Sequence, residues 1–174
     1  LSHQNQEEGK ENPTLLECKN QDEQTPLLIA SFRQDLEMLH LLIQHGANAQ
    51  ACSADGRNAL SLCLTRFAGA PAQTAATIRL LGDQTNILFN AAGGPRGHAP
   101  LHHLVDQVPA APEEAEPLIA YLISKGASPD LADTQGKTVL DRAIQQNQER
   151  LVIQLIQLGA GRTLNLKATQ TYFR

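Results

Sequence analysis

The apolar residues of this chain recur every three or four positions in short segments that turn-forming residues separate. Between residues 36 and 45, for example, Leu36, Leu39, Leu42 and Ile43 fall on one side of a helix. Similar stripes predict further helices at about 26–33, 59–67, 74–81, 100–107, 116–125, 139–146 and 149–158. The pattern therefore predicts an all-α domain made of short helices in pairs.

The helix pairs begin and end with the same kinds of residue. Thr25-Pro26-Leu27 predicts a helix start, because Thr is a good N-cap and Pro fits the first helical position. Related starts follow at Asn58, Ala99 and Thr138, at intervals of 33, 41 and 39 residues. Glycines keep the same register: they precede three starts by two residues, at Gly56, Gly97 and Gly136, and they end second helices at Gly46, Gly126 and Gly159. Several landmarks in one register indicate an internal repeat.

The repeat resembles the ankyrin repeat, whose signature is Thr-Pro-Leu-His-x-Ala at a period of about 33 residues. The quoted starts carry the resemblance, above all residues 25–30 and Ala99-Pro100-Leu101-His102. It covers about residues 17–161 and implies an all-α repeat solenoid, in which stacked helix–turn–helix units carry projecting β-hairpin or loop fingers. We expect an ankyrin-repeat domain at 13–161, with repeats at about 24–50, 51–90, 91–130 and 131–161. Residues 1–12 are polar and are expected to be disordered, and 162–174 form a tail without a predicted structure.

Several details depart from the signature. Glu23 takes the place of the glycine before the first start, so we expect an irregular first finger. Residues 68–73 and 108–113 are interpreted as inserted turns between the two helices of a pair. The second helix of the second repeat is predicted either to stop at Gly82 or to continue through Phe89, and residues 90–97 are expected to form a longer finger. The many glutamines of the fourth repeat favour a capping role for it.

Composition narrows the functions open to this chain. Of the 174 residues, 41% are hydrophobic but only 3% aromatic, which suits a core of Leu, Ile and Ala. A net charge of −4 speaks against binding nucleic acid, and no apolar run is long enough to predict a membrane span. Three cysteines without a Cys-x-x-Cys pattern favour a reducing, cytoplasmic compartment. Because the sequence starts at Leu1, we expect it to be a piece of a longer protein.

The resemblance implies a scaffold for protein–protein interaction that binds a partner through its concave face, meaning the fingers together with the first helix of each pair. The residue before each helix start forms a column of Gln24, Arg57, His98 and Lys137, which is mostly basic. We hypothesise that these side chains bind a polar or acidic peptide segment of another protein. The alternative is that they are ordinary solvated charges, since Asp22, Asp55, Asp106 and Asp133 lie nearby in the sequence. The predicted protein-binding residues are Phe32, Arg33, Arg57, Arg66, Arg96, His98 and Lys137.

A catalytic function competes with this interpretation. His102, His103 and Asp106 lie within one helical turn, and Cys63 lies in the equivalent helix of the preceding repeat. Such residues can hold a metal or form a nucleophile–base pair. However, His102 matches the structural His of the ankyrin signature, and Cys63 stands where the signature has a small Ala. We therefore predict a monomer that is not an enzyme and that has no catalytic residues, no metal and no cofactor.

Two further hypotheses concern the context of the chain. It can be the substrate-targeting arm of a larger multidomain enzyme or secreted effector, whose catalytic part lies outside these residues. The glutamine content and degenerate repeats resemble ankyrin proteins that intracellular bacteria inject into host cells, which would place the chain in the host cytosol.

Overall fold

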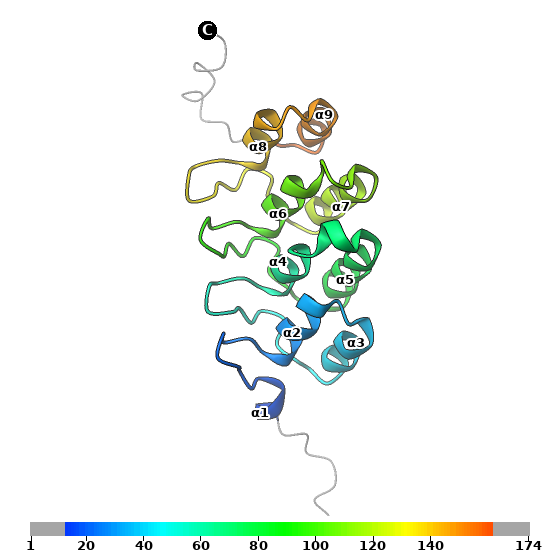
Figure 1. The fold of residues 1–174 in the computed structure, drawn as a ribbon, viewed down its shortest axis with the longest axis vertical. Helices are drawn as coiled ribbons and strands as arrows, with labels where there is room; N and C mark the ends of the chain where they lie inside the picture. The colour runs from blue at the N-terminus through cyan, green and yellow to red at the C-terminus, as the bar shows by residue number, and fades with distance from the viewer. Residues whose placement is uncertain (1–12, 162–174) are drawn as a thin grey trace, which may run out of the picture.

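The computed structural model describes residues 13–161, and it confirms the predicted all-α repeat fold (Figure 1). In this range no strand forms, and β pairing is limited to isolated bridges at Cys52–Asn58 and Gly93–His98. The predicted disordered segment 1–12 and the tail 162–174 lie outside the described residues. The helices are α1 (Pro13–Leu16), α2 (Pro26–Arg33), α3 (Leu36–Gln44), α4 (Ala59–Leu64), the 3-10 turn η1 (Phe67–Gly69), α5 (Pro71–Gln84), α6 (Pro100–Gln107), α7 (Pro112–Ser124), α8 (Val139–Gln145) and α9 (Glu149–Gln157).

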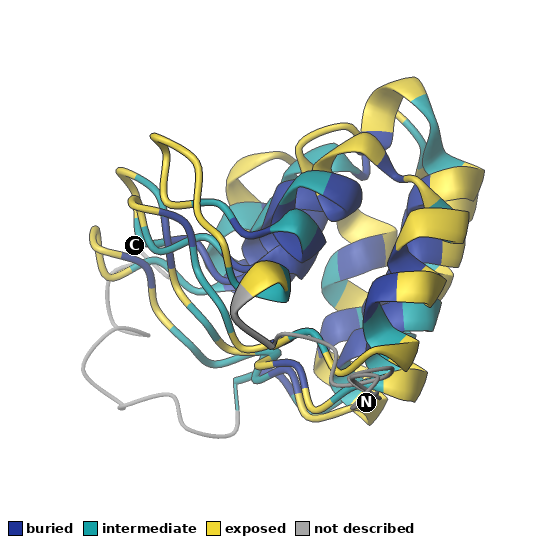
Figure 2. Cartoon of the chain, turned by 90° about the horizontal axis from the view of Figure 1, so that it is seen from below, coloured by how far each residue is buried: buried dark blue, intermediate teal, exposed yellow. Residues whose placement is uncertain are grey.

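Helices α2 to α9 form helix pairs that stack along one axis (Figure 1). The first helices, α2, α4, α6 and α8, lie in one column, and the second helices, α3, α5, α7 and α9, lie in another. Loops between successive pairs project to one side as fingers, which Figure 2 shows in a view along the stack. Such an array is stabilised mainly by contacts between neighbouring repeats. The boundaries of the individual repeats remain a prediction from the sequence.

The first helices begin where the sequence places them. The side chains of Thr25, Asn58 and Thr138 each accept a hydrogen bond from the backbone N–H three residues later, which satisfies an N–H that the helix itself leaves unpaired. Ala99 has no such acceptor, and there Pro100 at the first helical position fixes a helical φ. The predicted N-cap role of Thr25 is therefore confirmed.

All four fingers turn through a residue with positive φ two positions before the helix start. The φ angle is 79° at Gly56, 58° at Gly97, 73° at Gly136 and 56° at Glu23. The expectation of an irregular first finger was wrong, because Glu23 adopts the left-handed conformation that glycine supplies in the other three. That conformation costs an L-residue about 1–2 kcal/mol.

The predicted inserted turns are partly helical. Helix α5 begins at Pro71 and α7 at Pro112, each several residues before its predicted start. Parts of residues 68–73 and 108–113 therefore lengthen the second helices, and Pro at the first helical position explains both starts. The remaining residues of each insertion make a short turn.

Helix α5 passes through Gly82 and ends at Gln84, so both predicted ends were wrong. Close packing explains the glycine, because a β-carbon at Gly82 would lie 2.6 Å from the hydroxyl of Tyr121 on α7. The third finger, at 85–99, is only one residue longer than the loops 45–58 and 125–138.

The core is aliphatic, and its last layer is incompletely covered. Ser31, Leu64 and Val105 occupy one position of the first three repeats and are fully buried, but the equivalent Ile144 is 42% exposed. Two of the glutamines predicted to cap the stack face inward instead, since Gln146 donates to Asp106 and Gln154 to the carbonyl of Glu116, both in the third repeat. Ile144 and Ile153 therefore leave an apolar outer surface on the fourth repeat.

Candidate protein-interaction face

Backbone hydrogen bonds join neighbouring fingers into a row. They run from the N–H of Ala54 to Asp22 O (3.1 Å), from Gly94 to Asp55 O (2.7 Å) and from Thr134 to Arg96 O (3.2 Å). A β-carbon at Gly93 would lie 2.4 Å from the backbone of Gly56, so glycine lets the second and third fingers touch. The spacing of side chains along the row is therefore fixed by main-chain contacts.

The predicted column before the helix starts is not uniform. Gln24, Arg57 and Lys137 are half-buried, whereas His98 is only 5% exposed. Arg96 is exposed at the tip of the third finger. Of the predicted binding residues, the cations that face solvent on the fingers are therefore Arg57, Arg96 and Lys137.

Arg57 forms an ion pair with Asp55 of its own finger. Its Nε and Nη2 atoms lie 2.6 and 2.5 Å from Oδ2 of Asp55. The hydrogen bond from Arg57 is the main cause that lowers the pKa of Asp55 to about 2, against a smaller opposing effect of burial. The contact orients the guanidinium and leaves its Nη1 edge for another group.

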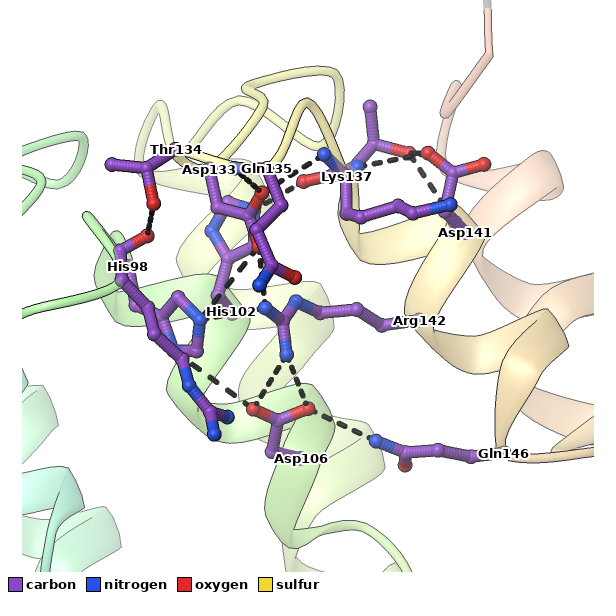
Figure 3. Close-up of polar contacts among 12 residues, drawn as sticks. His98, His102, Asp106, Asp133, Thr134, Gln135, Lys137, Asp141, Arg142 and Gln146 are labelled. Atoms are coloured by element: carbon purple, nitrogen blue, oxygen red, sulfur yellow. Dashed lines mark hydrogen bonds and ion pairs between the residues drawn. The ribbon is translucent and has the colours of Figure 1, made fainter. Parts of the chain in front are cut away.

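His98 was expected on the surface, but it lies inside the junction between the third and fourth repeats (Figure 3). Its Nε2 is 2.6 Å from Nη2 of Arg142. Because a guanidinium only donates, Nε2 must accept, and the ring proton of neutral His98 is on Nδ1. Burial lowers the pKa of His98, and the charge of Arg142 lowers it further. His98 thus acts as a buried hydrogen-bond acceptor and does not present a charge to a partner.

Arg142 of α8 is the centre of this junction. Its Nη1 lies 3.2 and 3.0 Å from the two carboxylate oxygens of Asp106 on α6, and its Nη2 lies 2.5 Å from Oδ2 of Asp133 (Figure 3). Burial alone would raise the pKa of Asp133, but hydrogen bonds from Arg142 and from the N–H groups of Lys137 and Gln135 outweigh it and hold the pKa at about 2. Asp106 and Asp133 therefore neutralise Arg142 and not the predicted column.

The residues that suggested catalysis have structural contacts. His102 is fully buried, and its Nε2 lies 3.2 Å from the carbonyl oxygen of Lys137 in the following finger. This is the role that the ankyrin resemblance implied. Cys63 is also fully buried, and burial raises the pKa of its thiol, which disfavours the reactive thiolate. No group of three or more His, Cys, Asp or Glu side chains within residues 13–161 has an arrangement suited to a metal.

The predicted residues Phe32, Arg33 and Arg66 lie at or just after the C-terminal ends of α2 and α4. Phe32 is 41% exposed, and the guanidinium carbon of Arg66 lies 5.5 Å from the centre of its ring. This cation–π contact keeps an exposed aromatic ring and a cation together. Arg33 is exposed beside Phe32 in sequence. At 41% exposure the Phe32 ring is partly accessible to solvent.

One pocket of about 330 Å³ opens between the second and third fingers and α6. Arg57, Arg96 and His98 line it, together with residues 93–95, His103 and Asp106. Three of the seven predicted binding residues therefore line one pocket, which brings Arg57 to Arg96 and His98 from the preceding finger.

The sequence interpretation did not identify Arg142 or His103 as part of this region. Burial lowers the pKa of His103 to about 4, so its ring is a neutral wall of the pocket at neutral pH. Arg142 lies four residues after the helix start at Thr138. From the sequence alone, a charged residue at this position is interpreted as an ordinary surface residue. The signal that could have found it is its place on the first helix of the fourth repeat, which adjoins the first helix that carries Asp106.

Comparisons with known proteins agree with this architecture. Residues 22–54 match the family model of the ankyrin repeat. The E3 ubiquitin-protein ligase KEG of Arabidopsis thaliana is 26% identical over 159 residues, which are 91% of this chain but only 9% of that protein. The crystal structure of an ankyrin repeat domain from Acinetobacter baumannii superposes with a TM-score of 0.73 at 23% identity, covering 83% of this chain and 69% of the other.

The stacked helix pairs and the row of fingers define a helical repeat solenoid. The family match over residues 22–54 and the structural likeness of the fold support the predicted ankyrin-repeat protein. Ankyrin repeats are generally protein–protein interaction modules, and the fold is typically non-catalytic. Among the helices of residues 13–161, none has both the length and the apolar character that crossing a membrane requires.

Proposed function

We propose that this chain binds a partner protein through its concave face, using the row of fingers and the first helices. The observation that supports the proposal best is the pocket that opens between Arg57, Arg96 and α6. The hydrogen-bonded fingers hold these side chains at a fixed spacing before a partner arrives. Binding to a preorganised surface loses less conformational entropy than binding to a mobile one.

Arg57, Arg96 and Lys137 are the finger residues that carry this proposal. Phe32, Arg33 and Arg66 extend the same face along the first helices, where an exposed ring beside a cation suits a protein partner. His98 contributes indirectly: it accepts a hydrogen bond from Arg142 and lines the pocket. We propose a cytoplasmic, monomeric module that uses no cofactor.

The test is capture of partners from a cell lysate with the 174-residue chain and two triple variants. In the first, Arg57, Arg96 and Lys137 are changed to Ser. In the matched control, Arg79, Lys125 and Arg150, which lie in or next to the second helices, are changed to Ser. Both variants lose the same charge, and exposed substitutions usually change stability by about 0.5 kcal/mol or less each.

We expect the control to retain the proteins that the parent chain captures, and the finger variant to lose them at an unchanged melting temperature. If both triple variants capture the same proteins as the parent chain, the finger residues do not form the binding site. Loss with both variants would mean that only net charge matters.

A second candidate is a substrate-targeting arm of a larger enzyme. The observation that favours it is the match to a ligase in which the aligned segment is 9% of the length. Reading the open reading frame on both sides of the codons for residues 1–174 tests this idea. A catalytic domain in the same frame would support it, and stop codons close to both ends would rule it out.

A further inference from the structure

The charged and polar groups around the pocket between the second and third fingers differ in how many contacts they make within the protein. The Asp106 carboxylate already accepts from Arg142 and from Gln146. His98 accepts from Arg142 as well, so its ring has no positive charge to offer. The Asp106 carboxylate and the acceptor nitrogen of His98 are therefore satisfied by the protein itself, whereas Nε2 of His103 has no hydrogen-bond partner among the described residues.

The two arginines that line the pocket, Arg57 and Arg96, make fewer contacts within the protein. Arg57 is bound on its Nε and Nη2 edge by Asp55, and its side chain runs across the next finger, since a β-carbon at Gly94 would lie 3.8 Å from its Cδ. Arg96 follows two residues later on that finger, is exposed, and makes no side-chain ion pair within residues 13–161. Two arginines therefore line the pocket, and of these two only Arg57 is paired with a carboxylate, that of Asp55.

We infer that this pocket is the seat for a carboxylate group of the partner, held between the guanidinium groups of Arg57 and Arg96. The inference rests on the proposed function and specifies its ligand as an acidic peptide. A guanidinium presents parallel N–H donors that match the two oxygens of a carboxylate. The Gly94–Asp55 backbone bond keeps the two fingers in place, so a carboxylate that enters does not have to order them.

The size of the pocket agrees with a small group. Its volume of about 330 Å³ is at the lower end of the range of roughly 300–1,000 Å³ that is usual for ligand sites. One acidic side chain or one chain terminus fits such a space, whereas a helix of the partner does not. The neutral rings of His98 and His103 form a wall that adds no competing positive charge.

The carboxylate can come from an Asp or Glu side chain or from a C-terminus, and three peptide probes distinguish these sources. They are N-acetyl-Gly-Glu-Gly-amide, N-acetyl-Gly-Gln-Gly-amide, and N-acetyl-Gly-Gly-Gly with its C-terminal carboxylate. Each is titrated into the ¹⁵N-labelled 174-residue chain at low ionic strength, and the backbone amide signals are followed.

The expected result is a saturable shift of the amide signals of Arg57, Gly94 and Arg96 with the Glu probe, the terminal-carboxylate probe or both, and not with the Gln probe. Arg96→Ser should weaken the effective probe at least fivefold. Arg150→Ser, an exposed arginine on α9, should leave its affinity unchanged. Equal shifts with the Gln probe, or no saturable shift with any probe, would overturn the inference.

The two proposals fail separately. If the finger variant loses its partner in the lysate but no carboxylate probe binds, the concave face is the binding site and the carboxylate seat is wrong. If the probes bind at the pocket but the finger variant captures every protein that the parent chain does, the seat exists and the proposed function is wrong.

Discussion

At the scale of single residues, the backbone at Glu23 shows how a turn can keep its shape without glycine. Glu23 has a φ of 56°, although Gly56, Gly97 and Gly136 hold the same position elsewhere. The turn survives because it is fixed by hydrogen bonds: the N–H of Glu23 donates to Asn20 O, as that of Gly56 donates to Ser53 O. The fold therefore tolerates a strained residue where its neighbours specify the turn.

Replacing Glu23 by glycine should stabilise the protein. Relief of the left-handed strain, about 1–2 kcal/mol, is partly offset by the greater freedom of glycine in the unfolded chain. We expect a net gain of about 0.5–1 kcal/mol, or roughly 1–4 °C in melting temperature. Circular dichroism during heating measures it, with Glu23→Ala as the control that removes the side chain but keeps the strain. A lower melting temperature for the glycine variant would show that the strain is absent.

The buried imidazoles predict a loss of stability in acid. Burial lowers the pKa values of His98, His102 and His103, that of His103 to about 4. The unfolded chain binds a proton at each of these sites near pH 6.5, but the folded chain does not. Stability is therefore fully present above about pH 6.5 and declines as the pH falls towards 4, by at most about 1.4 kcal/mol per pH unit for each group.

Urea unfolding between pH 7 and pH 4.5 checks this pH dependence. We expect His103→Gln to have a shallower decline than the parent chain, since one of the groups has been removed. His40→Gln, which removes an exposed histidine of α3, serves as the control and should keep the parent slope. Parallel slopes for all three proteins would mean that His103 titrates alike in the folded and unfolded states.

At the scale of elements, the sequence determines the first helices better than the second. Caps such as Thr25 and Asn58 are local signals, so the starts of α2, α4 and α8 were predictable from a few residues. The length of α5 was not predictable in this way, because Gly82 is a stop signal by itself. It becomes a helical residue only because Tyr121 of the next repeat packs against it.

The same distinction applies to the candidate site. Repeat register places Arg57 and Arg96 on neighbouring fingers, which the sequence could show. It could not show that His98 is buried, since that depends on Arg142 reaching it from 44 residues away. Side chains that bridge repeats are the least accessible to sequence interpretation, because both partners look like surface residues in their own helix.

Equivalent positions of different repeats should respond differently to truncation. Leu64→Ala should cost about 2–5 kcal/mol, because Leu64 is fully buried between repeats. Ile144→Ala removes a side chain that is 42% exposed at the equivalent position and should cost about 1 kcal/mol or less. Urea unfolding of the two variants measures the difference. Similar losses would indicate that something covers Ile144 in solution.

At the scale of the whole molecule, Arg142 couples the last repeat to the rest of the solenoid. In a repeat array, stability is approximately a sum over repeats and their interfaces. The junction made by Arg142, Asp106, Asp133 and His98 belongs to one interface only. Damage to it should therefore release α8 and α9 without unfolding the first repeats.

Arg142→Ala tests this coupling. It leaves the buried carboxylate of Asp133 without its partner, for which the usual loss is about 3–5 kcal/mol. Hydrogen exchange should accelerate in α8 and α9 and remain near the parent rate in α2 and α3. The control is Arg150→Ala, which removes an exposed arginine of α9. Uniform acceleration along the chain would instead show that the repeats unfold as a single unit.

The thiols offer an independent view of the other end of the stack. Cys18 is exposed, Cys52 is half-buried and Cys63 is fully buried, and all three precede the third repeat. A thiol reagent can modify Cys63 only when the second repeat opens. The rate at which Cys63 is modified therefore measures how readily that repeat opens. Without any engineered cysteine, the chain therefore reports on local opening of its first half, and modification of the exposed Cys18 supplies the reference rate.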